Sequence, residues 1–176
     1  MIVPHGRPKG RKSQLGAAQR RTPITPSPGE WGRGEGSPVT PRILVDSNVL
    51  LDVIKDDPVW GAWSAQALAK HLERGALVIN PIVYAEIAFD FDTIEEVDAL
   101  LPPADYDYAD LPREAAFLAA RCHARYRASG GARAMILPDF LIGAHATVER
   151  MALLTRDARR YRSYFPGLKL IAPTGA

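Results

Sequence analysis

Residues 42–54 read RILVDSNVLLDVI, in which the polar triplet Asp46-Ser47-Asn48 separates two largely apolar stretches. The residues Ile43-Leu44-Val45 follow Pro41 and are typical of a buried strand in a parallel sheet. The polar triplet ends this strand, and a helix is expected from about Val49 to Ile54. A strand that passes directly into a helix indicates an α/β fold.

The same alternation of strands and helices continues to the end of the chain. Further strands are expected at residues 77–79, 106–108, 151–155 and 168–171. Further helices are expected at residues 60–74, 82–89, 94–101, 112–128, 137–150 and 157–164. Thr93 and Glu96 have the spacing of a capping box at the start of one of these helices. The alternation predicts a three-layer α/β/α domain with a mainly parallel central sheet.

Charge is divided unevenly along the 176 residues. Residues 1–42 contain eight Lys or Arg and two acids, whereas the remainder contains 14 Lys or Arg and 18 acids. Residues 1–41 are rich in Gly and Pro and have no apolar period, so they are predicted to be a disordered basic tail. Residues 42–176 are predicted to form the folded domain. The tail is interpreted as a flexible leader, as sequence added by an upstream start codon, or as a basic arm that touches RNA.

The composition also excludes several classes of protein. The mildly acidic folded part argues against a large basic platform for nucleic acid. Cys122 is the only cysteine, so no intrachain disulfide can form, which fits a reducing cytoplasm. No apolar run approaches the roughly 20 residues of a membrane helix, and no secretory signal is visible. We therefore expect a cytoplasmic protein without a membrane segment.

Four acidic residues fall where an α/β fold collects its ligands. Asp46 directly follows the first strand, and Asp157 closely follows the strand at 151–155. Glu86 lies on the helix after the strand at 77–79, and Asp139 lies in the first turn of its helix. Because sites in such folds form beyond the carboxyl ends of the strands, these four acids are expected to converge at one edge of the sheet.

A cluster of this kind suits a divalent cation. Mg²⁺ prefers oxygen ligands and needs only a few carboxylates beside a substrate phosphate. Taken singly, each acid has another explanation: Asp46 as a turn residue, Asp139 and Asp157 as acids at helix starts, and Glu86 as a solvated helix residue. Their conjunction points instead to metal-assisted cleavage of a phosphodiester.

Four motifs in this order resemble those of PIN domains, in the form common among bacterial VapC-type toxins. The first is Val45-Asp46-Ser47-Asn48-Val49-Leu50-Leu51-Asp52, and the second is Tyr84-Ala85-Glu86-Ile87. The third begins Leu137-Pro138-Asp139-Phe140, and the fourth is Leu154-Thr155-Arg156-Asp157. The resemblance extends from about Arg42 to Pro173, and Ser47 stands where the family often has Thr.

This resemblance implies a PIN-like fold and an Mg²⁺- or Mn²⁺-dependent endoribonuclease that acts as the toxin of a toxin–antitoxin pair. It implies RNA as the substrate, a cognate antitoxin as the partner and a homodimer. Asp46, Glu86, Asp139 and Asp157 are then both the catalytic residues and the metal ligands. Ser47, Asn48 and Thr155 are auxiliary: the two hydroxyls are expected to help at the site, and Asn48 to support it by hydrogen bonds.

Three other functions are open at this point. The chain could be a PIN-fold nuclease of RNA processing, or a catalytically silent module that binds RNA or protein. A phosphate-receiving signalling domain also gathers acids at strand ends, but a lone Asp46 follows the first strand here, and Lys169 lies inside the last one. His145 is interpreted as a packed or surface histidine, not a base. The arginines 159, 160 and 162 either steer RNA phosphate or form a solvated helix face.

Overall fold

The computed structural model describes residues 42–75, 77–130 and 137–174. The predicted basic tail at residues 1–41 lies outside the described residues. A central five-stranded sheet has the strand order β3-β2-β1-β4-β5, and each pair of neighbouring strands is parallel. The strands are β1 (Ile43–Val45), β2 (Leu77–Ile79), β3 (Tyr106–Tyr108), β4 (Ala152–Leu154) and β5 (Leu170–Ile171).

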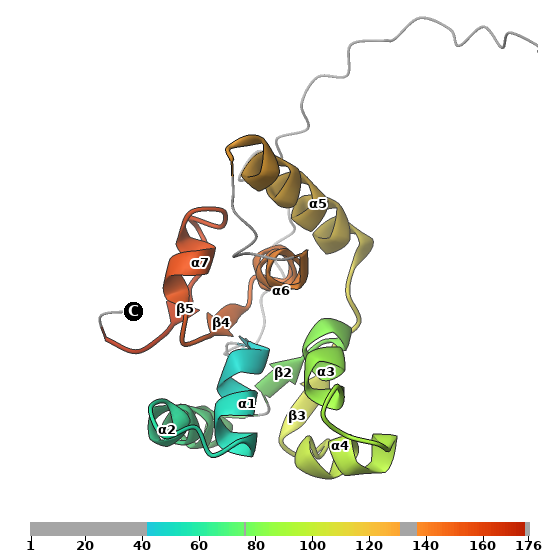
Figure 1. Cartoon of the computed structure of the whole chain (residues 1–176), viewed down its shortest axis with the longest axis vertical. Coiled ribbons are helices and arrows are strands. Elements are labelled where there is room, and N and C mark those ends of the chain that lie inside the picture. The colour runs from blue at the N-terminus through green and yellow to red at the C-terminus, as the bar shows by residue number, and fades with distance from the viewer. Residues whose placement is uncertain (1–41, 76, 131–136, 175–176) are drawn as a thin grey trace, which may run out of the picture. The chain divides into compact units, whose positions relative to one another are not determined.

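Helices connect consecutive strands, as the sequence predicts. They are α1 (Ser47–Ile54), α2 (Gly61–Leu72), α3 (Pro81–Ala88), α4 (Ile94–Leu100), α5 (Arg113–Ala128), α6 (Leu137–Val148) and α7 (Ala158–Arg162). Figure 1 shows α1 and α2 on one side of the sheet and α5 and α6 on the other. The predicted three-layer α/β/α architecture with a parallel sheet is confirmed.

The core follows from this layering. All residues of β1, β2 and β4 are buried, because helices cover both faces of the three central strands. Such strands have no solvent face, which explains why their sequences are continuous apolar runs and not an alternation of apolar and polar residues.

Local signals set several helix starts. The Asn80 side chain accepts hydrogen bonds from the backbone N–H groups of Ile82 and Val83, and Pro81 occupies the first turn of α3. Thr93 and Glu96 form the predicted capping box at the start of α4.

The boundaries differ from the predictions mainly at helix ends. Helix α1 begins at Ser47, two residues earlier than expected, because Asp46 still has extended backbone angles and the next residue is already helical. Helix α6 ends at Val148 and not at Arg150, whose φ of 54° lies in the left-handed region and takes the chain out of the helix. These ends depend on the backbone conformation of single residues, which periodicity does not reveal.

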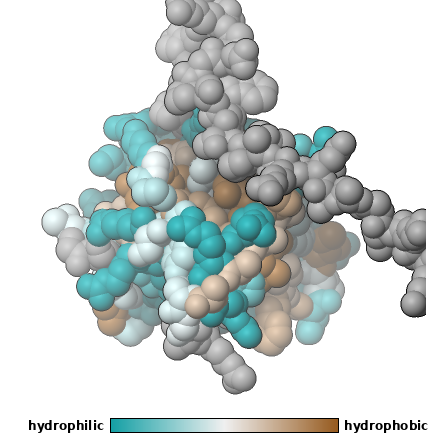
Figure 2. All heavy atoms as spheres, turned by 90° about the horizontal axis from the view of Figure 1, so that it is seen from above, coloured by the Kyte–Doolittle hydropathy of each residue, from teal (hydrophilic) through white to brown (hydrophobic). Residues whose placement is uncertain are grey.

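Among the described residues, no helix is long and apolar enough to span a membrane. On the face seen in Figure 2, hydrophilic side chains are interspersed with smaller apolar areas. The most exposed large apolar side chain is that of Phe89, which is 88% exposed.

At Gly143, helix α6 packs closely against Tyr161 and Phe165. A Cβ atom at this position would lie 2.5 Å from a ring carbon of Phe165 and 2.9 Å from one of Tyr161.

We expect Gly143→Ala to destabilise the protein by about 1–3 kcal/mol, although alanine favours helix, since two buried rings would have to move. Urea denaturation measures the effect. Gly167→Ala is the control, because nothing lies within 4 Å of its added Cβ; equal stability of the two variants would contradict the packing argument.

Candidate active site

Asp46 is the most deeply buried of the four predicted acids, with 4% of its surface exposed. It occupies the N-cap position of α1, but its side chain makes no capping hydrogen bond. Its Oδ2 atom instead accepts hydrogen bonds from the Thr155 hydroxyl at 2.8 Å and the Asn48 amide at 2.7 Å. The Tyr161 hydroxyl donates a third, at 3.0 Å. The turn interpretation of Asp46 is therefore insufficient, because groups from two distant segments converge on its carboxylate.

Burial is the main influence on the charge of Asp46. It raises the pKa of Asp46 from 3.8 to about 6, although the hydrogen bonds from Thr155 and Tyr161 oppose the increase. The negative charges of Asp139 and Glu86 raise this pKa further. Helices α3 and α6, which carry Glu86 and Asp139, pack against each other.

Glu86 is held from the same side by the next residue of the first motif. The Ser47 hydroxyl donates a hydrogen bond to Glu86 Oε2 at 2.5 Å. Burial raises the pKa of Glu86, the Ser47 hydrogen bond lowers it, and the charge of Asp139 raises it again. Glu86 is therefore not a fully solvated helix acid. The apolar residues around it in the sequence already pointed to partial burial.

Asp157 joins the group through an arginine. The Arg160 guanidinium lies 2.6 Å from Asp157 Oδ2 and 3.3 Å from Asp139 Oδ1. The backbone N–H of Asp157 donates to the Thr155 hydroxyl at 3.1 Å, and that hydroxyl in turn donates to Asp46. Thr155 thus links the fourth motif to the first.

The donor set fits a hard divalent cation in its chemistry. Carboxylate and hydroxyl oxygens surround the end of β1, and such ligands suit Mg²⁺ or Mn²⁺. In the positions that the side chains have in the described part of the chain, however, no three Asp, Glu, His or Cys residues are grouped closely enough to hold one ion. A common ligand set of all four acids is therefore still a prediction, and it requires some of these side chains to turn.

Sequence reasoning missed Tyr161 and the contacts of Arg160. Tyr161 is fully buried, and burial and the charge of Asp46 raise its pKa well above the usual value. Ala158 and Tyr161 lie three residues apart in an arginine-rich helix, so they are on the same side of it. This spacing could have predicted that both side chains face the interior. Ala158 is fully buried as well.

His145 is packed in the interior, which decides between the packed and the surface location that the sequence left open. It is 1% exposed, and its Nδ1 atom lies 3.1 Å from the Asn80 amide nitrogen. Asn80 also caps α3, so the pair connects α6 to the helix that carries Glu86. Burial lowers the pKa of His145, which favours its neutral form.

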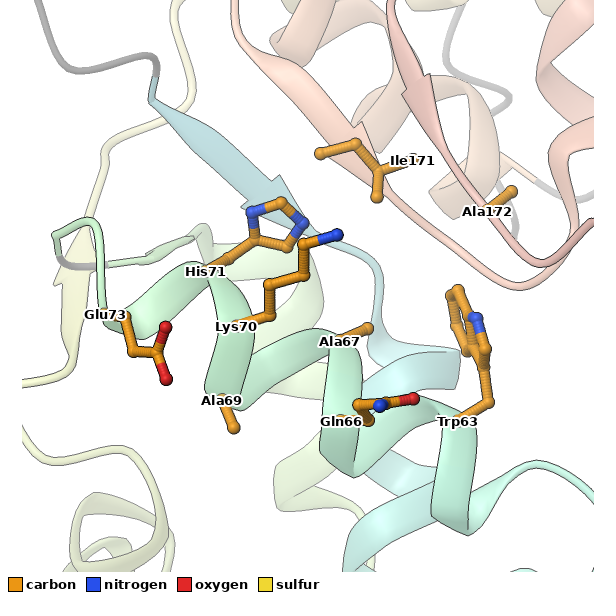
Figure 3. A pocket seen from close by; sticks show the side chains of 9 residues that line it. All are labelled: Trp63, Gln66, Ala67, Ala69, Lys70, His71, Glu73, Ile171 and Ala172. Atoms are coloured by element: carbon orange, nitrogen blue, oxygen red, sulfur yellow. The ribbon is translucent and has the colours of Figure 1, made fainter.

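Two pockets differ in their relation to these acids. One of about 640 Å³ is lined by Ser47 and Glu86, by apolar residues that include Phe89, and by the ion pair of Lys55 and Asp90. The other, of about 530 Å³, lies between α2 and the end of β5, where Trp63, Lys70 and His71 face Ile171 (Figure 3). None of the four acids lines this second pocket, so the first is the one that adjoins the candidate site.

A comparison with protein families matches the part of the chain that contains the candidate site. The family model of the PIN domain matches residues 43–165, which include all four acids. None of the curated proteins matches the chain.

Several solved structures are similar in fold. VapBC2 from Rickettsia felis, bound to a DNA fragment from its promoter, is 18% identical with a TM-score of 0.57, over 74% of this chain and 97% of that one. FitAcB from Neisseria gonorrhoeae is 16% identical with a TM-score of 0.55, over 76% and 99%. A toxin–antitoxin complex from Klebsiella pneumoniae is 21% identical with a TM-score of 0.53, over 76% and 99%. At these identities the likeness concerns the fold.

The raised pKa of Asp46 predicts a pH-dependent stability. Between pH 3.8 and about 6 the folded carboxyl binds more protons than the unfolded one, so ionising it destabilises the metal-free protein as the pH rises. Asp46→Asn removes this charge. As the pH rises from 3.8 to about 6, the free energy of unfolding of Asp46→Asn should increase relative to that of the wild type, by at most about 3 kcal/mol. Above this interval the difference should stay constant.

Urea denaturation in EDTA at several pH values measures this difference. The control variant is Glu73→Gln, an exposed position just before β2, at the opposite end of the strand from the site. If the free energies of unfolding of Asp46→Asn and the wild type differ by the same amount at pH 4 and at pH 7, burial does not disfavour the ionised carboxylate.

Proposed function

Because the PIN domain model matches most of this chain, the chain belongs to the PIN domain family, and we propose that it is a metal-dependent endoribonuclease that acts in the cytoplasm as the toxin of a toxin–antitoxin pair. PIN domains are generally nucleases. The observation that carries the proposal is a set of contacts at the carboxyl end of the parallel sheet: Thr155 links Asp46 to Asp157, and Arg160 bridges Asp157 and Asp139. Ser47, the residue after Asp46, donates to Glu86.

We propose that Asp46, Glu86, Asp139 and Asp157 hold Mg²⁺ or Mn²⁺. When bound, the cation supplies water activation and charge stabilisation for cleavage of the RNA phosphodiester. Thr155 and Asn48 hold Asp46 in place by their hydrogen bonds to Oδ2. Ser47 orients Glu86 in the same way.

We also propose that a protein partner, the antitoxin, covers the surface next to the acids. The exposed ring of Phe89 lies one helical turn beyond Glu86, and both residues line the same pocket with Leu51, Ile82 and Pro138. An exposed apolar surface beside a polar site is typical of a protein interface. The structures similar in fold include toxin–antitoxin complexes, which agrees with this assignment. A homodimer belongs to the same proposal.

Metal-dependent RNA cleavage by the purified chain tests the activity. We expect cleavage with Mn²⁺ or Mg²⁺, its loss in EDTA, and its recovery when the cation is restored. Asp46→Asn and Asp139→Asn should each reduce the rate by at least about 100-fold because each removes an anionic oxygen near the phosphate. Glu73→Gln should cleave like the wild type. Cleavage that persists after exhaustive chelation would contradict the metal mechanism, and no cleavage of any RNA by the wild type would favour a silent binding module.

The partner surface has a separate test. If a small DNA-binding protein is encoded beside this chain, the two should co-purify, and the partner should stop RNA cleavage. Phe89→Lys should weaken the complex at least about tenfold in a binding titration, since it places a charge in an apolar contact. Phe117→Lys changes a ring in α5 that is 70% exposed and should have little effect. Equal weakening by both variants would argue against a specific contact at Phe89.

A further inference from the structure

Arg160 is the cation that touches the candidate site in the described part of the chain. Its Nε atom lies 2.6 Å from Asp157 Oδ2, and its Nη1 atom lies 3.3 Å from Asp139 Oδ1. The two acids come from different elements, since Asp139 opens α6 and Asp157 precedes α7. One guanidinium therefore bridges two of the four proposed metal ligands.

The contact of Arg160 with Asp139 is a hydrogen bond as well as an ion pair. Within the described residues, Asp46 has no ion pair of this kind and is stabilised by hydroxyl and amide donors instead. Arg160 thus offsets charge on the side of the site that is formed by α6 and α7.

Another nearby arginine has a different role. Arg156 lies 2.6 Å from Asp52 Oδ1, and the Asp52 side chain also accepts a hydrogen bond from Ser64. Asp52 is 3% exposed and is not one of the four acids, so this pair ties α1 to α2 and to the loop after β4. Arg159 is exposed, and no contact with an acid is found for it. Arg160 thus differs from Arg156 and Arg159, because its guanidinium contacts two of the four acids.

We infer that Arg160 is an internal counter-ion of the site, which competes with the divalent cation for Asp139 and Asp157 and must release them before the ion is fully bound. This inference rests on the proposed function. An arginine stays charged at all physiological pH values, so proton loss cannot remove the competition. The competition sets the concentration of free metal at which the site becomes loaded, because a cation that must displace a bound charge binds with a lower apparent affinity.

In this role Arg160 is a positioning residue and not a catalytic one. It holds two carboxylates that would otherwise repel each other, and it keeps the acidic site folded while no metal is bound. The variant Arg160→Gln keeps much of the side-chain length and removes the charge, whereas Arg160→Lys keeps the charge but loses the planar two-sided contact. The neighbouring variant Arg159→Gln removes an equal charge that lies outside these contacts.

Mn²⁺ binding to the purified full chain, measured by isothermal titration calorimetry at pH 7, tests the inference. We expect Arg160→Gln to bind Mn²⁺ about fivefold to tenfold more tightly than the wild type, because two partly exposed ion pairs are lost together. Arg160→Lys should stay within about threefold of the wild type, and Arg159→Gln should be unchanged. In EDTA, Arg160→Gln should melt at a lower temperature than the wild type, and Mn²⁺ should raise its melting temperature by more.

The outcomes separate the two proposals. If Mn²⁺ binds the wild type and Asp139→Asn abolishes binding, the metal site stands, and equal or weaker Mn²⁺ affinity of a folded Arg160→Gln then overturns the counter-ion role alone. An equal gain in affinity for Arg159→Gln also overturns it, since general charge would explain the effect. If the wild type does not bind Mn²⁺ at all, the proposed metal site and the counter-ion role fail together.

Discussion

The carboxylate of Asp46 is removed almost completely from water at the end of the central strand, and it is kept there by donors from other parts of the chain. A buried carboxylate is costly unless it is hydrogen-bonded, and the hydroxyls of Thr155 and Tyr161 offset part of that cost. Both donors come from the segment after β4, which therefore lies next to the end of β1.

The parallel sheet brings the remaining acids to the same place. Strand β1 lies between β2 and β4, and the Asp46 backbone N–H donates to the Leu154 carbonyl at 2.9 Å. The chain leaves each of these three strands at the same edge, where α1, α3 and the segment before α7 begin. A site at this edge thus draws its groups from segments that are far apart in the sequence, which is the general property of open α/β sheets.

Concentrated negative charge is the consequence of this geometry, and the domain offsets it in three ways. Hydroxyl and amide donors stabilise Asp46, Ser47 holds Glu86, and Arg160 bridges Asp139 and Asp157. In the proposed metal site each of these carboxylates would be a ligand, so the contacts that stabilise the metal-free domain involve the same side chains that would bind the cation.

The sequence by itself determined the alternation of elements and the capping box of Thr93 and Glu96, and it supplied the four acids of the proposed site. These features are local: a buried parallel strand is a short apolar run, a helix start has its own donors and acceptors, and strand ends in an α/β fold share one edge. The prediction was therefore sound for the strands β1, β2 and β3, whose bounds agree residue by residue.

Only the tertiary structure decided which side chains surround these acids. The hydroxyl of Tyr161 meets Asp46 across 115 positions of sequence, and Arg160 meets Asp139 across 21. No local period encodes such a meeting, because it depends on how α7 packs against α6 and on which rotamer each side chain adopts. The sequence showed where negative charge would gather, whereas the packing of distant segments determined how that charge is buried, paired and held.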